Sequence, residues 1–132
     1  MTHACREGVL TFGDTYWAEQ DPSVSSYDGM QYRIRDNYLD MLNKFDVEVA
    51  PGGMLWKIFQ DRYPDVNLFN ADGIHALPNG SYLLACSIYS VIYRKSPVGT
   101  YIPDGVNTDE ANNIQNIVYK SLFKLDPDWR CY

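Results

Sequence analysis

Basic residues, cysteines and long apolar runs are all scarce in this chain. The 132 residues hold 11 Lys and Arg against 17 Asp and Glu, and Arg94-Lys95 is the longest basic cluster. This balance gives no electrostatic footprint for nucleic acid or for an anionic membrane, so neither is an expected partner. The longest apolar stretch, Tyr82–Tyr93, is interrupted by serines and is too short to span a bilayer. Residues 1–6 have no apolar segment typical of a signal peptide, so we expect a soluble chain without an export signal.

The few cysteines exclude a disulfide framework and a zinc site. Their positions, Cys5, Cys86 and Cys131, fit no zinc-ligand spacing. Cys86 lies within an apolar stretch, which indicates a buried small side chain. A pairing of Cys5 with Cys131 stays open only if the two termini meet. Neither a metal nor an organic cofactor is implied.

The order of the expected elements is that of a mixed α/β domain. Strands are expected over 8–12 and 47–50, and helices from Ser26 to Phe45, from Met54 up to Tyr63-Pro64, over 78–93, and from Thr108 onward. The alternation of strand, helix, strand and helix favours a parallel sheet covered by helices. Since 132 residues is an ordinary length for one domain, we expect a single domain over residues 1–132.

Three finer expectations concern the segments between and within these elements. Residues 15–26 are polar and are expected to form a loop that carries Trp17. The stretch 82–93 is apolar on nearly all sides, so it is expected to be the most buried helix. Thr108 precedes an acidic first turn and is expected to cap the last helix.

The stretch Asp72-Gly73-Ile74-His75 has the residue types of a catalytic pair. A carboxylate three residues before an imidazole, on a turn that contains glycine, can orient that imidazole as a general base. A general base needs a nucleophile, and the chain offers no convincing one. The simpler alternative is that Asp72 and Gly73 form an ordinary Asx-type turn and that His75 is a solvated loop residue. Spacing alone favours this alternative, because Asp-x-x-His occurs often by chance.

Several segments together resemble one known family, the SGNH (GDSL-like) hydrolases. Asp72–His75 followed by Gly80–Cys86 resembles the last block of that family, Thr11–Gly13 its T-W-G strand end, Ser26–Gln31 its S-Y-x-x-M-Q helix start, and Ala50–Trp56 its A-P-V-G-x-A-W turn. The similarity covers about residues 8 to 99. It implies that Asp72 and His75 are the acid and base of a Ser-His-Asp triad.

The blocks that carry the family's nucleophile and oxyanion donors have no counterpart in this chain. The resemblance therefore implies the C-terminal half of an SGNH hydrolase domain, with a partial flavodoxin-like three-layer fold of two short parallel strands and about four helices. It also implies a small-molecule or carbohydrate acyl ester as substrate and an isolated chain that is inactive. Ala76 and Leu77 stand where the family often has Pro and Ser, which removes a helix cap worth about 1 kcal/mol.

A second alignment makes the chain a minimal complete hydrolase. Val9–Thr15 resembles a strand that runs into the nucleophile turn, with Thr15 in place of the usual Ser. Too few residues then separate this turn from Asp72 for the intervening strands, and the branched Thr side chain suits a crowded turn poorly. Asn79-Gly80 and Asn112-Asn113 are the other candidate oxyanion donors, although both are more simply surface or turn residues.

A third interpretation is a catalytically inactive, aromatic-rich module that binds carbohydrate or another partner. In it Trp17, Trp56 and either Tyr16 or Tyr101 stack on sugars, whereas the simpler role for the tryptophans is packing at the ends of elements. An incomplete sheet also leaves one strand edge and some helix faces uncovered. We therefore expect self-association or pairing with a complementing N-terminal half.

Overall fold

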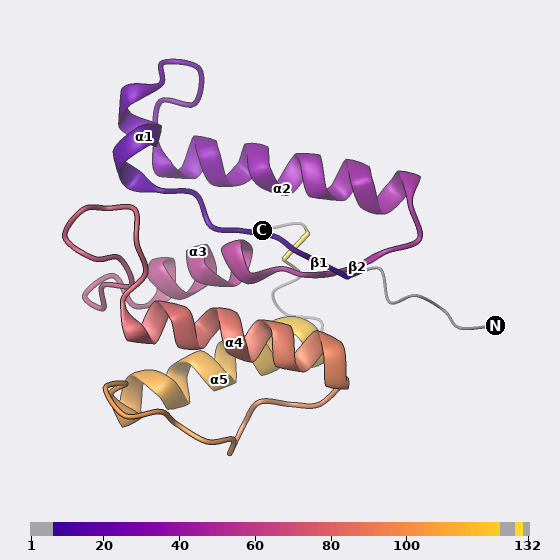
Figure 1. Ribbon diagram of the computed structural model, residues 1–132, viewed down its shortest axis with the longest axis vertical. Helices are drawn as coiled ribbons and strands as arrows, with labels where there is room; N and C mark the ends of the chain where they lie inside the picture. Colours follow the sequence, from indigo (N-terminus) through magenta and orange to yellow (C-terminus); the bar gives the residue numbers. More distant parts are fainter. Residues whose placement is uncertain (1–6, 125–128, 131–132) are drawn as a thin grey trace.

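A computed structural model describes residues 7–124 and 129–130, and within them the chain is a mixed α/β structure (Figure 1). The elements are the strands β1 (Glu7–Val9) and β2 (Glu48–Ala50) and the helices α1 (Thr15–Gln20), α2 (Tyr27–Lys44), α3 (Gly52–Arg62), α4 (Pro78–Tyr93) and α5 (Thr108–Phe123). The expected α/β class with two parallel strands is confirmed. Across the described ranges, every helix is too short or too polar to traverse a lipid bilayer.

β1 and β2 form a two-stranded parallel sheet in which Val9 lies opposite Ala50. The pairing continues past the strands, because Leu10 donates its N–H to the Ala50 carbonyl at 2.9 Å and accepts from the Gly53 N–H at 2.8 Å. Successive residues of a strand direct their backbone N–H and C=O groups to opposite edges. Because Leu10 directs these groups to β2, Val9 directs its N–H and C=O to the other, outer edge of β1. There its carbonyl accepts a hydrogen bond of 2.7 Å from the Tyr38 hydroxyl. Among the described residues, no strand pairs with this edge.

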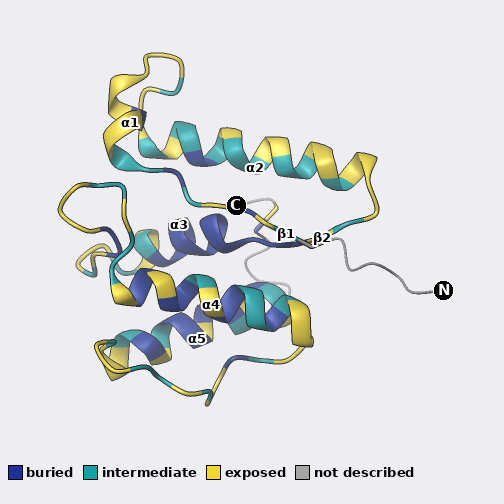
Figure 2. Ribbon diagram, viewed as in Figure 1, coloured by how far each residue is buried: buried dark blue, intermediate teal, exposed yellow. Residues whose placement is uncertain are grey.

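Helices lie on both sides of the sheet, with α2 on one side and α4 and α5 on the other (Figure 1). α3 is the central helix, because α2, α4 and α5 all contact it. Every residue from Gly52 to Phe59 is buried (Figure 2). The expectation that residues 82–93 form the most buried helix is therefore wrong. α4 exposes 48% of Ile92 and 62% of Tyr93, so its apolar composition is no guide to its place in the fold.

The starts of two helices differ from the expectation. The expected loop over 15–26 begins with α1, because Asp14 caps a helix by accepting the Trp17 N–H on its Oδ1 at 2.6 Å. Asp suits an N-cap as well as a turn, and the sequence alone does not separate the two. α5 is capped by Asn107 and not by Thr108, since the Asn107 side chain accepts from the first two amides beyond Thr108.

The segment after β1 is held by a buried amide and a close backbone contact. Gly13 donates its N–H to Gln31 Oε1 at 2.7 Å, and Gln31 Nε2 donates to the Thr11 carbonyl at 3.4 Å. Gln31 is fully buried and is the one buried side chain of α2. A Cβ on Gly53 would lie 1.9 Å from the Thr11 carbonyl oxygen, so only glycine allows α3 to approach this closely.

The expected burial of Cys86 is confirmed. Its side chain is 4% exposed, and burial raises the pKa of the thiol to about 11. The thiol is therefore protonated and unreactive at neutral pH. Cys5 and Cys131 lie outside the described residues.

Replacing Gly53 with Ala is expected to destabilise the chain by about 1–3 kcal/mol, because the new Cβ overlaps the Thr11 carbonyl and forces the backbones apart. Urea unfolding followed by circular dichroism measures the change. Gly8→Ala is the matched control, since its Cβ would have its nearest neighbour at an ordinary 3.7 Å. Equal stability of the two variants would contradict the role given to this contact.

Candidate functional site

The Asp72–His75 turn is the tip of a small hairpin between α3 and α4. Phe69 pairs with Ala76 in an antiparallel bridge, and the Asn70 N–H donates to the His75 carbonyl at 2.7 Å. Phe69 is 4% exposed, so the stem of this hairpin is part of the core while its tip reaches solvent. The backbone that carries the imidazole is therefore held from the core side.

The Asp72 carboxylate binds the turn with one oxygen and the imidazole with the other. Its Oδ1 accepts the N–H groups of Ile74 and His75, both at 2.9 Å, and its Oδ2 lies 2.7 Å from His75 Nδ1. The hydrogen bond from the His75 N–H, followed by those from the ring and from Ile74, lowers the pKa of Asp72 to about 2. The Asx-type turn and the Asp-His pair, which the sequence presents as alternatives, are thus one arrangement.

The His75 ring is oriented but largely in solvent. Its side chain is 76% exposed. A carboxylate beside Nδ1 favours the neutral tautomer with its proton on Nδ1, which leaves a lone pair on Nε2. Among the described residues, Asp72 is the sole hydrogen-bond partner found for this ring. His75 is therefore a solvated loop residue, as the simpler alternative expects, and the described residues place no hydroxyl or thiol against its Nε2.

Thr15 contacts the turn through Gly73 and not through His75. The Gly73 carbonyl accepts both the Thr15 N–H, at 2.9 Å, and the Thr15 hydroxyl, at 3.1 Å. Gly73 has a φ of +71°, and a Cβ at this position would lie 2.3 Å from Thr15 Oγ1. Glycine is therefore required at position 73, because it adopts the positive φ readily and because a Cβ would collide with the Thr15 hydroxyl. Sequence analysis missed this contact, because nothing in either segment points to the other.

The turn lies at the carboxyl end of the parallel strands. β1 and β2 both lead toward the end of the molecule where α1 and the loop before α4 are found, at the left of Figure 1. Ligands of open α/β sheets bind outside this end of the strands. The position of Asp72 and His75 is thus one at which the fold class places binding sites.

Asn79 anchors the base of the hairpin. The sequence suggests a surface or turn residue, but Asn79 is 8% exposed in the first turn of α4. Its Nδ2 donates to the Asn67 carbonyl at 3.0 Å and to Glu110 Oε2 at 2.9 Å. Because its amide protons are used in this way, Asn79 links the loop to α5 and is not an oxyanion donor. Asn112 is exposed on α5, as expected.

Trp56 does not take the sugar-stacking role that the sequence allows for it. It is fully buried, with its ring stacked on Phe12 at a centroid distance of 4.1 Å and tilted against Phe69 at 4.9 Å. A Cβ on Gly80 would lie 2.5 Å from the Trp56 ring, so α4 packs directly on this indole. That interpretation is therefore wrong for Trp56, because no ligand reaches a ring enclosed on several sides.

The other aromatic candidates are accessible but lie in two places. Tyr16 and Trp17 on α1 are 48% and 56% exposed. Tyr101 is 78% exposed. Its segment, residues 94–107, runs past α5 at the end of the molecule opposite α1 (Figure 1). Tyr101 therefore does not share a surface with Tyr16 and Trp17.

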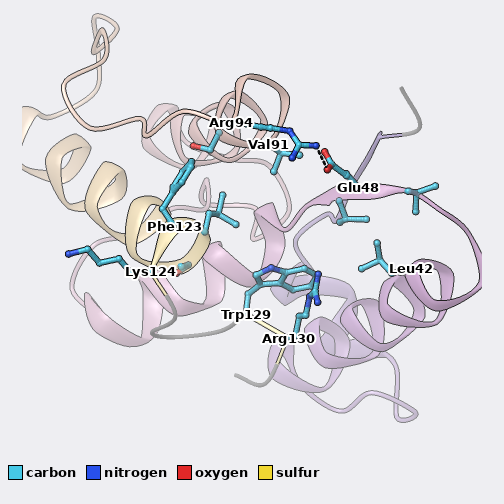
Figure 3. A pocket seen from close by; sticks show the side chains of 13 residues that line it. Leu42, Glu48, Val91, Arg94, Phe123, Lys124, Trp129 and Arg130 are labelled. Carbon is cyan, nitrogen blue, oxygen red and sulfur yellow. Dashed lines mark hydrogen bonds and ion pairs between the residues drawn. The ribbon is translucent and has the colours of Figure 1, made fainter. Parts of the chain in front are cut away.

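A cavity of about 600 Å³ lies at the other end of the sheet, where α2, α4 and α5 end and β2 begins (Figure 3). Leu42, Val91 and Trp129 form apolar parts of its wall, and the Glu48–Arg94 ion pair lies along one side. Its described lining contains no imidazole or thiol. No residue of the Asp72–His75 turn lines this cavity, so the two are separate places on the molecule.

No protein-family model matches the chain, and neither does a curated protein or a solved structure. The resemblance to the SGNH hydrolases therefore depends on the residues of this chain alone.

Replacing Asp72 with Asn is expected to change the tautomer of neutral His75. The Asn carbonyl takes over the two backbone N–H groups, and its NH2 group then faces Nδ1, which favours a proton on Nε2. Long-range ¹H–¹⁵N spectra measure the tautomer populations directly. The exposed Asp104→Asn variant is the control. An identical tautomer mixture in wild type, Asp72→Asn and Asp104→Asn would contradict the hydrogen bond between Asp72 and His75.

The stability of the chain is expected to depend on the ionisation of Asp72. Its folded pKa of about 2 lies below the unfolded value of about 3.9. The ionised carboxylate therefore stabilises the fold above about pH 4, and this contribution is lost as the pH falls toward 2. The difference in unfolding free energy between wild type and Asp72→Asn should shrink over that interval. A difference that does not change with pH would contradict the low pKa.

Proposed function

We propose that the chain is the C-terminal part of an SGNH-type ester hydrolase and supplies the general base of its catalytic triad. The observation that carries the proposal is the 2.7 Å contact between Asp72 Oδ2 and His75 Nδ1 on an otherwise solvent-exposed ring. In this role Asp72 orients the imidazole, and Nε2 is the atom that accepts the proton.

The nucleophile in this proposal is a serine on a complementing segment outside these 132 residues. Its hydroxyl proton passes to Nε2 of His75 while its oxygen attacks the ester carbonyl carbon. Asp72 stabilises the resulting imidazolium, which returns the proton to the departing alcohol. Water then repeats the sequence on the acyl-enzyme and releases the acid. The complementing segment also supplies the N–H donors for the oxyanion.

The outer edge of β1 is the proposed place for that segment. Val9 directs its backbone groups to this edge, and its side chain is 40% exposed. α2, which lies over the sheet, buries only Gln31 and leaves 40% of Met41 exposed, and Phe45 directly after it is 56% exposed. An added parallel strand would take over the Val9 carbonyl from the Tyr38 hydroxyl, pair with β1 and cover part of this apolar surface, which completes the flavodoxin-like three-layer fold. Self-association of two copies is the alternative use of the same edge.

The minimal hydrolase based on Thr15 is the less favoured alternative. The Thr15 hydroxyl donates to the Gly73 carbonyl, so its proton is directed to the backbone. The Asn79 amide, one of the candidate oxyanion donors, is engaged by Asn67 and Glu110. These two contacts favour a structural role for Thr15. The substrate class remains a small-molecule or carbohydrate acyl ester.

The isolated chain is expected not to hydrolyse p-nitrophenyl acetate above background. Co-expression with the serine-bearing N-terminal half of an SGNH hydrolase is expected to restore turnover. In that complex His75→Ala or Asp72→Asn should lower kcat by at least about 10³-fold, because the base or its tautomer is lost. Asp104→Asn, an exposed acid outside the site, is the matched control.

Two results would contradict the proposal. If the restored activity does not change in His75→Ala, the imidazole takes no part in the reaction. Activity of the isolated chain that depends on both His75 and Thr15 would instead support the minimal hydrolase, and Thr15→Ala is the variant that separates the two cases.

A further inference from the structure

The cavity at the end of the sheet where β2 begins has the size and the wall of a small-molecule site. Its volume of about 600 Å³ is that of a pocket that encloses a small ligand. α2, β2, α4 and α5 all contribute side chains to it (Figure 3). Apolar groups make up much of the wall, among them Leu42, Val91, Leu122 and Trp129. This wall suits a ligand with an apolar body.

Two serine hydroxyls in the wall lack a hydrogen-bond partner. Ser90 on α4 and Ser121 on α5 line the cavity and are 3% and 8% exposed. No partner for either Oγ is found among the described residues. Buried polar groups of folded proteins are normally paired, because an unpaired one is unfavourable. An oxygen acceptor inside the cavity would supply a partner.

The charges at the wall are mainly positive. Acids outnumber bases in the chain by 17 to 11, yet the charged lining residues are Glu48, Arg94, Lys124 and Arg130. Lys124 extends away from the cavity, whereas Arg94 and Arg130 lie on opposite sides of it (Figure 3). Arg94 is paired with Glu48, and the Arg130 guanidinium lies 5.5 Å from the centre of the Trp129 ring. This excess of arginine favours an anionic group over a cationic one.

Arg94 and Ser90 present hydrogen-bond donors from one face of α4. They are four residues apart, so they are neighbours on the helix surface. Glu48 accepts from Nη2 of Arg94, and no hydrogen bond from its other guanidinium nitrogens is found among the described residues. The planar guanidinium matches a carboxylate. Because the Arg94 side chain is 77% exposed, the charged end of such a ligand stays in contact with water.

We propose that this cavity binds an amphipathic carboxylate, a molecule with one carboxylate group and an apolar alkyl or aryl body. The carboxylate accepts hydrogen bonds from Arg94 and from the Ser90 hydroxyl. The apolar body lies against Val91 and Trp129. No residue of the Asp72–His75 turn takes part, so the site does not depend on the ester-hydrolase proposal.

Isothermal titration of the full chain tests the chemical class of the ligand. The probes are the alkanoates from hexanoate to dodecanoate and phenylbutyrate, each below its micelle concentration. At least one is expected to bind saturably with one site per chain. The alcohol with the same body should bind at least about tenfold more weakly, and the amine weaker still, because Arg94 prefers an anion.

Two variants of α4 test the proposed donors. Ser90→Ala and Arg94→Gln are each expected to lower the affinity for the bound carboxylate by at least about tenfold. Ser87→Ala is the matched control for the serine, since Ser87 is also buried and unpartnered on α4 but does not line the cavity. Lys95→Gln, an exposed base outside the lining, is the control for the arginine. Both controls should bind as wild type does.

Glu48→Gln tests the sign of the ligand's charge. The substitution removes the carboxylate that competes for Arg94, so the affinity for the carboxylate should rise by at least about threefold. Asp46→Asn, an exposed acid outside the lining, should leave it unchanged. A gain in affinity does not arise from a damaged fold, so this variant is informative whatever the serine and arginine variants do to stability.

Four results would overturn the carboxylate site. These are no saturable binding of any carboxylate, equal affinity for the alcohol or the amine, weaker binding in Glu48→Gln, and an equal loss in Ser87→Ala and Ser90→Ala. The second would identify a purely apolar site. The third would identify a cationic ligand.

Discussion

The backbone carbonyl of Gly73 connects the two parts of the candidate site. It accepts two hydrogen bonds from Thr15, which begins α1, and it belongs to the turn that presents His75. The φ of +71° at Gly73 directs the carbonyl to this position, and the absence of a side chain lets Thr15 approach. The segment after β1 and the loop before α4, far apart in sequence, therefore form a single surface. Displacement of either segment would therefore also shift the other.

Local spacing predicted the features whose partners are local, and long-range packing decided the rest. Asp72 and His75 are three residues apart, so the sequence offered their contact as one of two alternatives, and the structure shows it at 2.7 Å. The recurrence of apolar residues located α2, but α1 has six residues and is too short to show a helical period. The local sequence does not distinguish the exposed Trp17 from the buried Trp56. Trp56 is buried because Phe12 and α4 reach it from distant segments, which no local pattern reveals.

The residues that carry the resemblance to the SGNH hydrolases have different physical roles. Gly13, Gln31 and Gly53 meet around the segment after β1, where hydrogen bonding and close packing explain each of them. Their presence follows from the fold, whatever the chain does. The His75 side chain is 76% exposed, so packing does not account for an imidazole there. Packing thus explains the resemblance in the core but not at the hairpin tip.

The hairpin around His75 also affects the energetics of any encounter at this surface. Its stem is paired through Phe69 and Ala76, and the Asp72 carboxylate limits the rotation of the ring. A group that docks on Nε2 meets an imidazole whose conformational freedom is already reduced in the folded chain. The entropy cost of ordering that side chain on association is therefore smaller than for an imidazole without such a partner.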